Sequence, residues 1–388
     1  MKWFKGILLT AYGILSFLPS LSQGITKYSF GEGIRLIAAD SSFSLKFSAR
    51  IQSLYEGELN LADDQFEDGF QIRRSRLKFD GFVYSPKLVY KIELAIANSD
   101  IASGAIPQSG NTSSIVLDAC VKWHFAGNWS LWFGQTKLPG NRERVISSQQ
   151  LQFVDRSNVN AKFNLDRDAG IQVHYDGNKV NLAGAVSMGE GRNMIVENAG
   201  GYNYTLRAEY LPFGKFADKG DYFGSDLSRE PQPRLSIGIT HDINNGATRE
   251  RGQLGDFMPS QRDLATWFVD AHFKYRGMSS MLEYAHRKAP DGPVILDEEG
   301  NFLHAFYTGE GLSWQAGYLF KNNFEIAGRY TSVKPEVATL RNRNVQYTMG
   351  VSRYFVQHSL KIQSDISFIR EDTKNDALVY RLQLELAF

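Results

Sequence analysis

The chain has 388 residues, of which 22% are charged and 13% aromatic, and its mean hydropathy is −0.32. This composition excludes a helical membrane protein, which needs long apolar stretches, and a disordered chain, which contains few aromatic residues. The formal net charge of +1 argues against a nucleic-acid partner, which would require a marked basic excess. The single cysteine, Cys120, excludes an intrachain disulfide and a zinc site built from cysteine pairs.

Residues 1–22 are predicted to be a secretory signal peptide. Two lysines precede a mostly apolar stretch at residues 6–18, and small residues stand at positions 20 and 22. Cleavage after Ser22 leaves 41 basic and 42 acidic side chains, since Lys2 and Lys5 are removed. We expect residues 23–42 to form an N-terminal periplasmic extension and residues 43–388 to form the main domain.

From Phe43 onward, apolar and polar residues alternate in sixteen segments. In residues 43–52, for example, every odd position is apolar or Ala and every even position is polar or charged. This period of two is typical of strands whose faces meet different solvents. The segments lie near residues 43–56, 70–83, 87–98, 114–125, 129–136, 167–176, 179–188, 202–211, 233–242, 264–275, 278–288, 310–320, 323–332, 344–354, 358–369 and 377–388.

The connections between these segments alternate between tight turns and longer polar loops. Tight turns lie at 85–86, 176–178, 276–277 and 321–322, and longer loops at 57–69, 99–113, 137–166, 189–201, 243–263, 289–309, 333–343 and 370–376. Because backbone groups in hydrocarbon must pair within the protein, a spanning sheet has to close. We therefore predict an all-β, transmembrane antiparallel barrel of about sixteen strands, with short periplasmic turns and long extracellular loops, in a bacterial outer membrane. A soluble sandwich or propeller is the alternative, for which segments of this length are long.

Seven short stretches, taken in order, are similar to the phosphate-selective porin O and P family, as found in Bacteroidetes-type bacteria. They are FQIRRSRLKFDG at 70–81, GQTKLP at 134–139, FVDRSNV at 153–159, RDAGIQV at 167–173, GEGRN at 189–193, YLPFG at 210–214 and the terminal Phe388. The resemblance implies a trimeric, sixteen-stranded porin whose third long loop folds into a lumen lined with arginines and lysines. It also implies that Phe388 is read by the barrel assembly machinery.

Six cations occupy the inward positions of the first three segments, and we predict that they line the channel and bind anions: Lys46, Arg50, Arg74, Arg76, Lys78 and Lys91. Against Asp80 and Glu93 they give a net charge of +4. A sixteen-stranded barrel encloses an aqueous channel, and a basic wall concentrates anions within it. Arginine forks also match phosphate oxygens bidentately.

The segment 137–166 is the predicted constriction loop. Its candidate anion contacts, together with the first residue of the next strand, are Lys137, Arg142, Arg144, Arg156 and Arg167. These charges have an alternative role, which is to pair with nearby carboxylates such as Asp155 and Asp166 and hold the loop against the wall. Contact with anions and pairing with carboxylates are compatible roles for these charges.

The predicted function is an outer-membrane porin for passive diffusion of small hydrophilic solutes, with a preference for anions such as phosphate. We predict no catalytic residue, cofactor or metal, since the seven histidines lie apart and no G-x-S-x-G motif occurs. The expected partners are small anions, outer-membrane lipid, the assembly machinery and two further copies of the chain. The alternatives are an outer-membrane hydrolase and a plugged structural or adhesion barrel.

Overall fold

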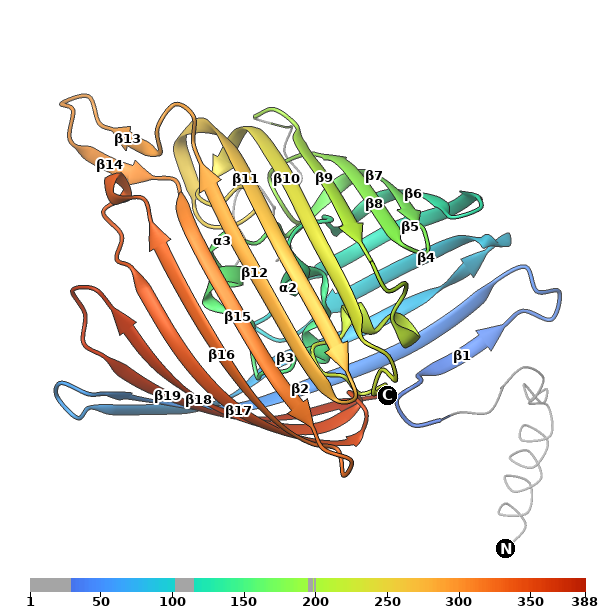
Figure 1. Ribbon diagram of the computed structural model, residues 1–388. Coiled ribbons are helices and arrows are strands. Elements are labelled where there is room, and N and C mark those ends of the chain that lie inside the picture. Colours follow the sequence, from blue (N-terminus) through green and yellow to red (C-terminus); the bar gives the residue numbers. More distant parts are fainter. Residues whose placement is uncertain (1–28, 102–114, 195–197, 199) are drawn as a thin grey trace, which may run out of the picture.

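The computed structural model describes residues 29–101, 115–194, 198 and 200–388, and its main element is a closed ring of sixteen antiparallel strands (Figure 1). The ring closes where β19 pairs with β2. Its members, in order, are β2 (Ser44–Asn60), β3 (Phe66–Val83), β4 (Ser85–Ala95), β5 (Val116–Ala126), β6 (Trp129–Lys137), β7 (Arg167–Asp176), β8 (Val180–Ser187), β9 (Asn203–Tyr210), β10 (Arg234–Arg249), β11 (Phe257–Tyr275), β12 (Met278–Lys288), β15 (Gly309–Leu319), β16 (Phe324–Pro335), β17 (Asn344–Val356), β18 (Leu360–Glu371) and β19 (Ala377–Ala387).

Each of the sixteen alternating segments becomes one strand of the ring, which confirms the predicted fold class. Two predicted long loops are shorter than expected, because strands continue through them. The connection expected at 57–69 is reduced to residues 61–65, and the one at 243–263 to residues 250–256. Strand ends that stand in water on both faces carry polar residues on both faces, so the alternation of polarity fades there while the backbone pairing continues.

The turn between β11 and β12 illustrates how the short connections form. Arg276 and Gly277 have φ values of 48° and 90°, so both central residues adopt the left-handed region. A two-residue hairpin turn of this type matches the right-handed twist of its strands, and glycine adopts such a φ without steric cost.

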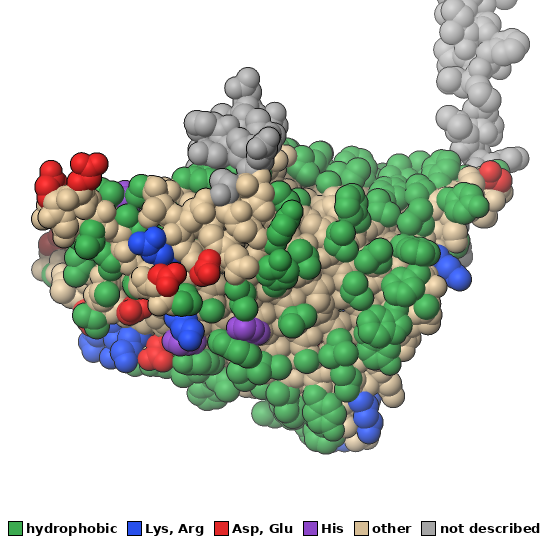
Figure 2. All heavy atoms as spheres, turned by 90° about the horizontal axis from the view of Figure 1, so that it is seen from above, with side chains coloured by type: hydrophobic (Ala, Val, Ile, Leu, Met, Phe, Trp, Pro, Cys, Tyr) green, Lys and Arg blue, Asp and Glu red, His purple; other side chains and the backbone are tan. Residues whose placement is uncertain are grey.

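Burial is inverted relative to a water-soluble domain. The large exposed side chains on the outer wall are apolar, such as Phe133 and Leu206 at 66% and 65% exposure, whereas inward Asp270, Lys361 and Glu385 are at most 1% exposed. Figure 2 shows one outer face, on which hydrophobic side chains cover most of the wall and charged side chains gather toward one end. A wall of this kind is matched to hydrocarbon outside and to polar groups inside.

Short helical pieces follow β6 and lie inside the ring in Figure 1: α2 (Arg142–Val145), η2 (Ser148–Gln150) and α3 (Asn158–Phe163). Val159 and Phe163 of α3 pack into an apolar cluster with inward-facing Phe268 and Val333. A further piece, η3 (Ala217–Tyr222), follows β9, and η4 (Val337–Thr339) follows β16. Beyond the ring, β13 (Val294–Leu296) pairs with β14 (Phe302–Ala305). Within the described residues, no helix has the length and apolar character that crossing a membrane requires.

At the N-terminus, β1 (Ile34–Ile37) pairs with the first residues of β2, next to the place where β19 ends. The predicted signal peptide at 1–22 lies outside the described residues. The C-terminal Phe388 exchanges two backbone hydrogen bonds with Ala49, of 2.9 and 3.0 Å. Its side chain is 44% exposed on the outer wall.

Candidate functional site: the barrel interior

The predicted lining cations lie on the inner wall, and five of the six form ion pairs. The pairs are Arg50–Glu385 at 3.8 Å, Arg74–Asp155 at 2.9 Å, Arg76–Glu93 at 2.8 Å, Lys78–Asp80 at 2.8 Å and Lys91–Asp118 at 2.7 Å. The sixth cation, Lys46, is half-buried opposite Asp80. The net charge of +4 counted two carboxylates but not Asp100, Asp118, Asp155 and Glu385, which the fold brings to the same cations. This wall is therefore a network of paired charges.

Asp155 joins the segment between β6 and β7 to strand β3. It accepts hydrogen bonds from Arg73 Nη2 at 2.6 Å and from Arg74 Nη2 at 2.9 Å. Burial alone would raise the pKa of Asp155, but the guanidinium groups of Arg74 and Arg73 hold it well below its usual range. Arg73 reaches this site because a β-bulge leaves it without a partner between the pairs Gln52–Arg74 and Ser53–Ile72.

The predicted loop cations divide into those that pair with carboxylates and those that bind backbone carbonyls. Arg144 pairs with Asp166, and Arg167, which begins β7, pairs with Asp118 at 3.1 Å. Lys137 donates to the carbonyl oxygens of residues 144–146 at 2.9–3.3 Å. Arg156 donates to those of residues 143 and 146 at 3.0 and 2.7 Å. The bonds of Lys137 and Arg156 hold the segment together internally, a role that the sequence did not predict, whereas the pairs of Arg144 and Arg167 correspond to the predicted pairing with carboxylates.

Arg142 fastens the same segment to the far wall. Its guanidinium is fully buried and lies 2.7 Å from Glu209 on β9 and 3.3 Å from Asp270 on β11. Arg207 pairs with the same two carboxylates, each at 2.7 Å. Two guanidinium groups shared by two carboxylates compensate one another, which offsets the cost of removing four charges from water.

Further contacts place residues 138–166 across the lumen. Ser148 accepts from Arg50 of β2 at 2.7 Å, and the backbone N–H of Val154 donates to Asp365 of β18 at 3.1 Å. On the opposite wall, Asn141 donates to Glu283 of β12 at 2.8 Å. The segment thus bonds to strands all around the ring, so it lies inside the barrel and narrows it.

A second inserted segment, residues 211–233 between β9 and β10, was given no role in the sequence analysis. It enters from the rim of the short turns, where the backbone N–H groups of Arg276 and Gly277 bind Glu230 and Asp226 at 2.9 and 2.7 Å. The length of this segment could have indicated from the sequence that it is inserted, since the other described connections on this rim are far shorter. Inward-facing apolar residues such as Phe268 and Met281 do not indicate this segment, because they pack against residues 138–166 instead.

The inner surface left open to water lies on β2 to β5, toward the short turns. The inward side chains there are half-buried, whereas those of β9 to β12 are buried except at strand ends such as Arg234 and Arg262. The open surface carries Lys46, Lys78, Lys91 and Lys122, and we call this group the lysine patch. Facing it, Asp80 is 28% exposed, but Glu93 is only 11% exposed.

Lys122 is the member of the lysine patch that the sequence analysis did not select. Its ammonium lies 3.3 Å from the centre of the Trp132 ring, whose other face is stacked on His174 at 3.9 Å. Among the described residues it has no carboxylate within ion-pair distance. Lys122 is a basic residue at an inward position of β5, as Lys91 is at an inward position of β4. The alternation of the sequence was therefore sufficient to select Lys122 as a lining residue.

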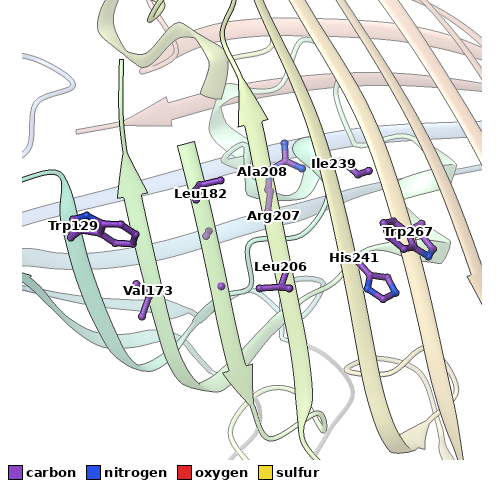
Figure 3. A pocket seen from close by; sticks show the side chains of 11 residues that line it. Trp129, Val173, Leu182, Leu206, Arg207, Ala208, Ile239, His241 and Trp267 are labelled. Atoms are coloured by element: carbon purple, nitrogen blue, oxygen red, sulfur yellow. The ribbon is translucent and has the colours of Figure 1, made fainter. Parts of the chain in front are cut away.

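An apolar groove of about 480 Å³ lies on the outside of the barrel, across β6 to β11 (Figure 3). Leu182, Leu206 and Ile239 lie in it, with Trp129 near one end and Trp267 near the other, whereas Arg207 points to the opposite side of the sheet. The groove belongs to the apolar outer wall and does not form part of the solute path.

Comparisons with known proteins agree with this arrangement. The model of the family described as phosphate-selective porin O and P matches residues 46–388. An uncharacterized protein of Aquifex aeolicus (strain VF5) is 22% identical over 302 residues, covering 70% of this chain and 67% of that protein.

Two solved structures show the same fold. One is a loop L8 deletion mutant of OmpT, an outer membrane protein of Vibrio cholerae, with a TM-score of 0.58 at 10% identity. The other is an anion-selective porin from Comamonas acidovorans, with a TM-score of 0.55 at 12% identity. Each match covers 89% of this chain and 100% of the other. Since the family model spans nearly the whole barrel, the chain belongs to the phosphate-selective porin O and P family of bacterial outer-membrane proteins.

Proposed function

We propose that this outer-membrane porin conducts small hydrophilic solutes with a preference for anions, phosphate among them. The observation that supports this preference is the lysine patch on β2 to β5. Lys78 pairs with Asp80, and Lys91 pairs with Glu93 and Asp118. Lys46 and Lys122 are half-buried and form no ion pair with a carboxylate of the described residues. Fixed charges beside low-dielectric walls raise the local concentration of the opposite ion. Arg50, Arg74 and the loop cations act mainly by positioning the segment 138–166, because groups of the protein occupy them. Arg76 is occupied by Glu93 and Asp100.

The partners follow from the same proposal. The apolar outer wall contacts lipid, and the exposed side chain of Phe388 at the seam between β19 and β2 is accessible to the assembly machinery. One similar structure is titled as a trimer form of Vibrio cholerae OmpT. We extend the trimeric state to this chain.

The lysine patch is tested by a double variant, Lys78→Gln with Lys122→Gln. Reversal potentials in a salt gradient across a planar bilayer, measured in chloride and in phosphate, should show the anion-to-cation permeability ratio falling by about twofold or more. The effect should weaken near 1 M salt, where the screening length is about 3 Å.

The matched control replaces two lysines outside the lumen, Lys321→Gln with Lys374→Gln. Both are exposed, on a short turn and on an outer loop. The control should keep the wild-type ratio. If the patch variant also keeps it, the lysine patch does not set selectivity.

A plugged barrel is a second candidate, favoured by the two inserted segments that fill much of the lumen. It differs from a porin in one measurement. A folded, inserted plugged barrel carries no current at any voltage, whereas a porin gives discrete conductance steps.

A further inference from the structure

The segment 211–233 crosses the short-turn mouth of the barrel. It begins beside β9 and reaches the turn between β15 and β16, where Arg229 donates to the Phe320 carbonyl at 2.6 Å and to Asn323 at 3.0 Å. Midway, Ser225 lies 2.6 Å from Glu325 of β16 and 2.6 Å from the hydroxyl of Tyr354 on β17. The segment therefore joins strands that are far apart around the ring.

The same segment touches the constriction loop, residues 138–166. The backbone N–H of Gly224 donates to the Gln150 carbonyl at 2.8 Å. A Cβ atom at position 224 would lie 2.6 Å from the Gln152 backbone nitrogen, so any other residue here has to move the two backbones slightly apart. Asp221 also lies 3.7 Å from the Arg142 guanidinium. Two segments that enter from opposite rims thus meet inside the lumen.

Their meeting closes one side of the channel. Behind the contact, Lys274 of β11, Tyr354 of β17 and Lys361 of β18 are each at most 1% exposed. The Lys274 ammonium donates to the Ser225 carbonyl at 2.7 Å, and the Lys361 ammonium to the Leu151 carbonyl at 3.1 Å. The backbone of residues 211–233 therefore covers Lys274, and the backbone of the constriction loop covers Lys361.

The two inserted segments are held differently. The constriction loop contributes several fully buried apolar residues to a cluster with the wall, among them Val159, Phe163 and Leu165. In residues 211–233 the fully buried apolar side chains, Leu211 and Phe216, lie near its start. The part that crosses the mouth is held mainly by hydrogen bonds, with half-buried Tyr222 and Phe223 in contact with Arg142 and His358. Water can replace hydrogen bonds, so this part opens at a lower free energy than the constriction loop.

We propose that residues 217–230 form a gate at the periplasmic mouth, closed in this structure by the Gly224–Gln150 contact and opened by displacement of the segment toward the periplasm. Opening uncovers Lys274 and Glu325, one charge of each sign, because both are bonded to Ser225 in the closed state. The open state therefore has a wider, more polar path and conducts more. The proposal rests on the channel function given above.

The test locks the gate with a disulfide. In a Cys120→Ser background, Gly224→Cys and Gln152→Cys place their Cβ atoms about 3 Å apart, close to disulfide geometry after a small shift. Oxidation with diamide, verified by mass spectrometry, should lower the mean single-channel conductance several-fold, and dithiothreitol should restore it. Equal conductance in the oxidised and reduced states would overturn the gate.

A second variant, which removes the gate, keeps the proposal testable if the double-cysteine variant does not fold. Deletion of residues 217–229, closed with a short Gly-Ser linker, should raise conductance several-fold. Ser228→Ala, an exposed position in the same segment whose hydroxyl makes one 3.5 Å contact, is the matched control and should behave as wild type. Wild-type conductance in the deletion variant rejects the gate but keeps the channel. No current from any folded variant rejects the channel function itself.

Discussion

At the scale of single residues, strict alternation identifies which side chains face inward but not what they bind. It places Arg74 and Arg76 on the inner face of β3, where they lie. It also places Arg73 outward, and that is wrong, because the bulge turns Arg73 toward Asp155. Asp155 itself comes from a loop some eighty residues later, so no local pattern predicts the pair.

Asp155→Asn tests this site. The change removes charge-assisted bonds to Arg73 and Arg74, and because the carboxylate is 22% exposed we expect a loss of about 1–3 kcal/mol in unfolding free energy. The native pKa lies below the unfolded value of about 4, so the carboxylate stabilises the fold above that pH and its contribution fades as the pH falls below it.

Denaturant unfolding in detergent between pH 3 and 7 measures both effects. The difference between wild type and Asp155→Asn should be constant above about pH 5 and decrease steadily from there to pH 3. Asp291→Asn, on an exposed outer loop, serves as the control and should be neutral throughout. A difference that is independent of pH would mean that Asp155 acts through packing rather than charge.

At the scale of elements, the constriction loop holds its place by combining a buried charge network with a small apolar core. Phe163 at the end of α3 is fully buried and meets the Tyr307 ring edge-on at a centroid distance of 5.5 Å. Its neighbours Phe268 and Val333 occupy inward positions of β11 and β16. An apolar residue at an inward position of a strand thus indicates that an inserted loop packs against the wall at that point.

Phe163→Ala should destabilise this packing by about 3–5 kcal/mol, since it leaves a cavity that the surrounding strands cannot close. The loop should then become mobile while the barrel persists. We expect noisier and larger single-channel currents and faster protease cleavage within residues 138–166, with unchanged heat-modifiable migration on gels. Phe302→Ala, at an exposed position on β14, is the control; cleavage equal to wild type in Phe163→Ala would show that the charge network alone holds the loop.

At the scale of the whole molecule, stability depends on the match between the outer wall and the bilayer. Leu206 stands midway along β9 and is 65% exposed to the surroundings of the barrel. Because hydrocarbon does not solvate charge, a charged side chain on this face lowers the free energy of unfolding by an amount that depends on its depth in the bilayer. A charged side chain in the lumen contacts water and carries no such cost.

Leu206→Arg should therefore cost about 2–4 kcal/mol of stability in lipid vesicles. Val337→Arg, in an 87% exposed position of η4 beyond the strands, should cost close to nothing. Reversible urea unfolding in vesicles, followed by tryptophan fluorescence, compares the two. Equal stability of both variants would place Leu206 outside the hydrocarbon layer.

The sequence by itself determined the ring and its two faces, because alternation repeats in each strand and depends only on neighbouring residues. It also indicated the inserted loop through its length and charge. Tertiary structure alone decided how the charges are used, since the partners of Arg50, Arg142 and Arg167 lie on strands distant in sequence. It also decided that residues 211–233 turn inward, because that depends on Gly224 meeting Gln150 across the lumen. Contacts between segments far apart in the chain form when the ring closes, and the local pattern, which predicts the closure, does not specify which of these segments meet.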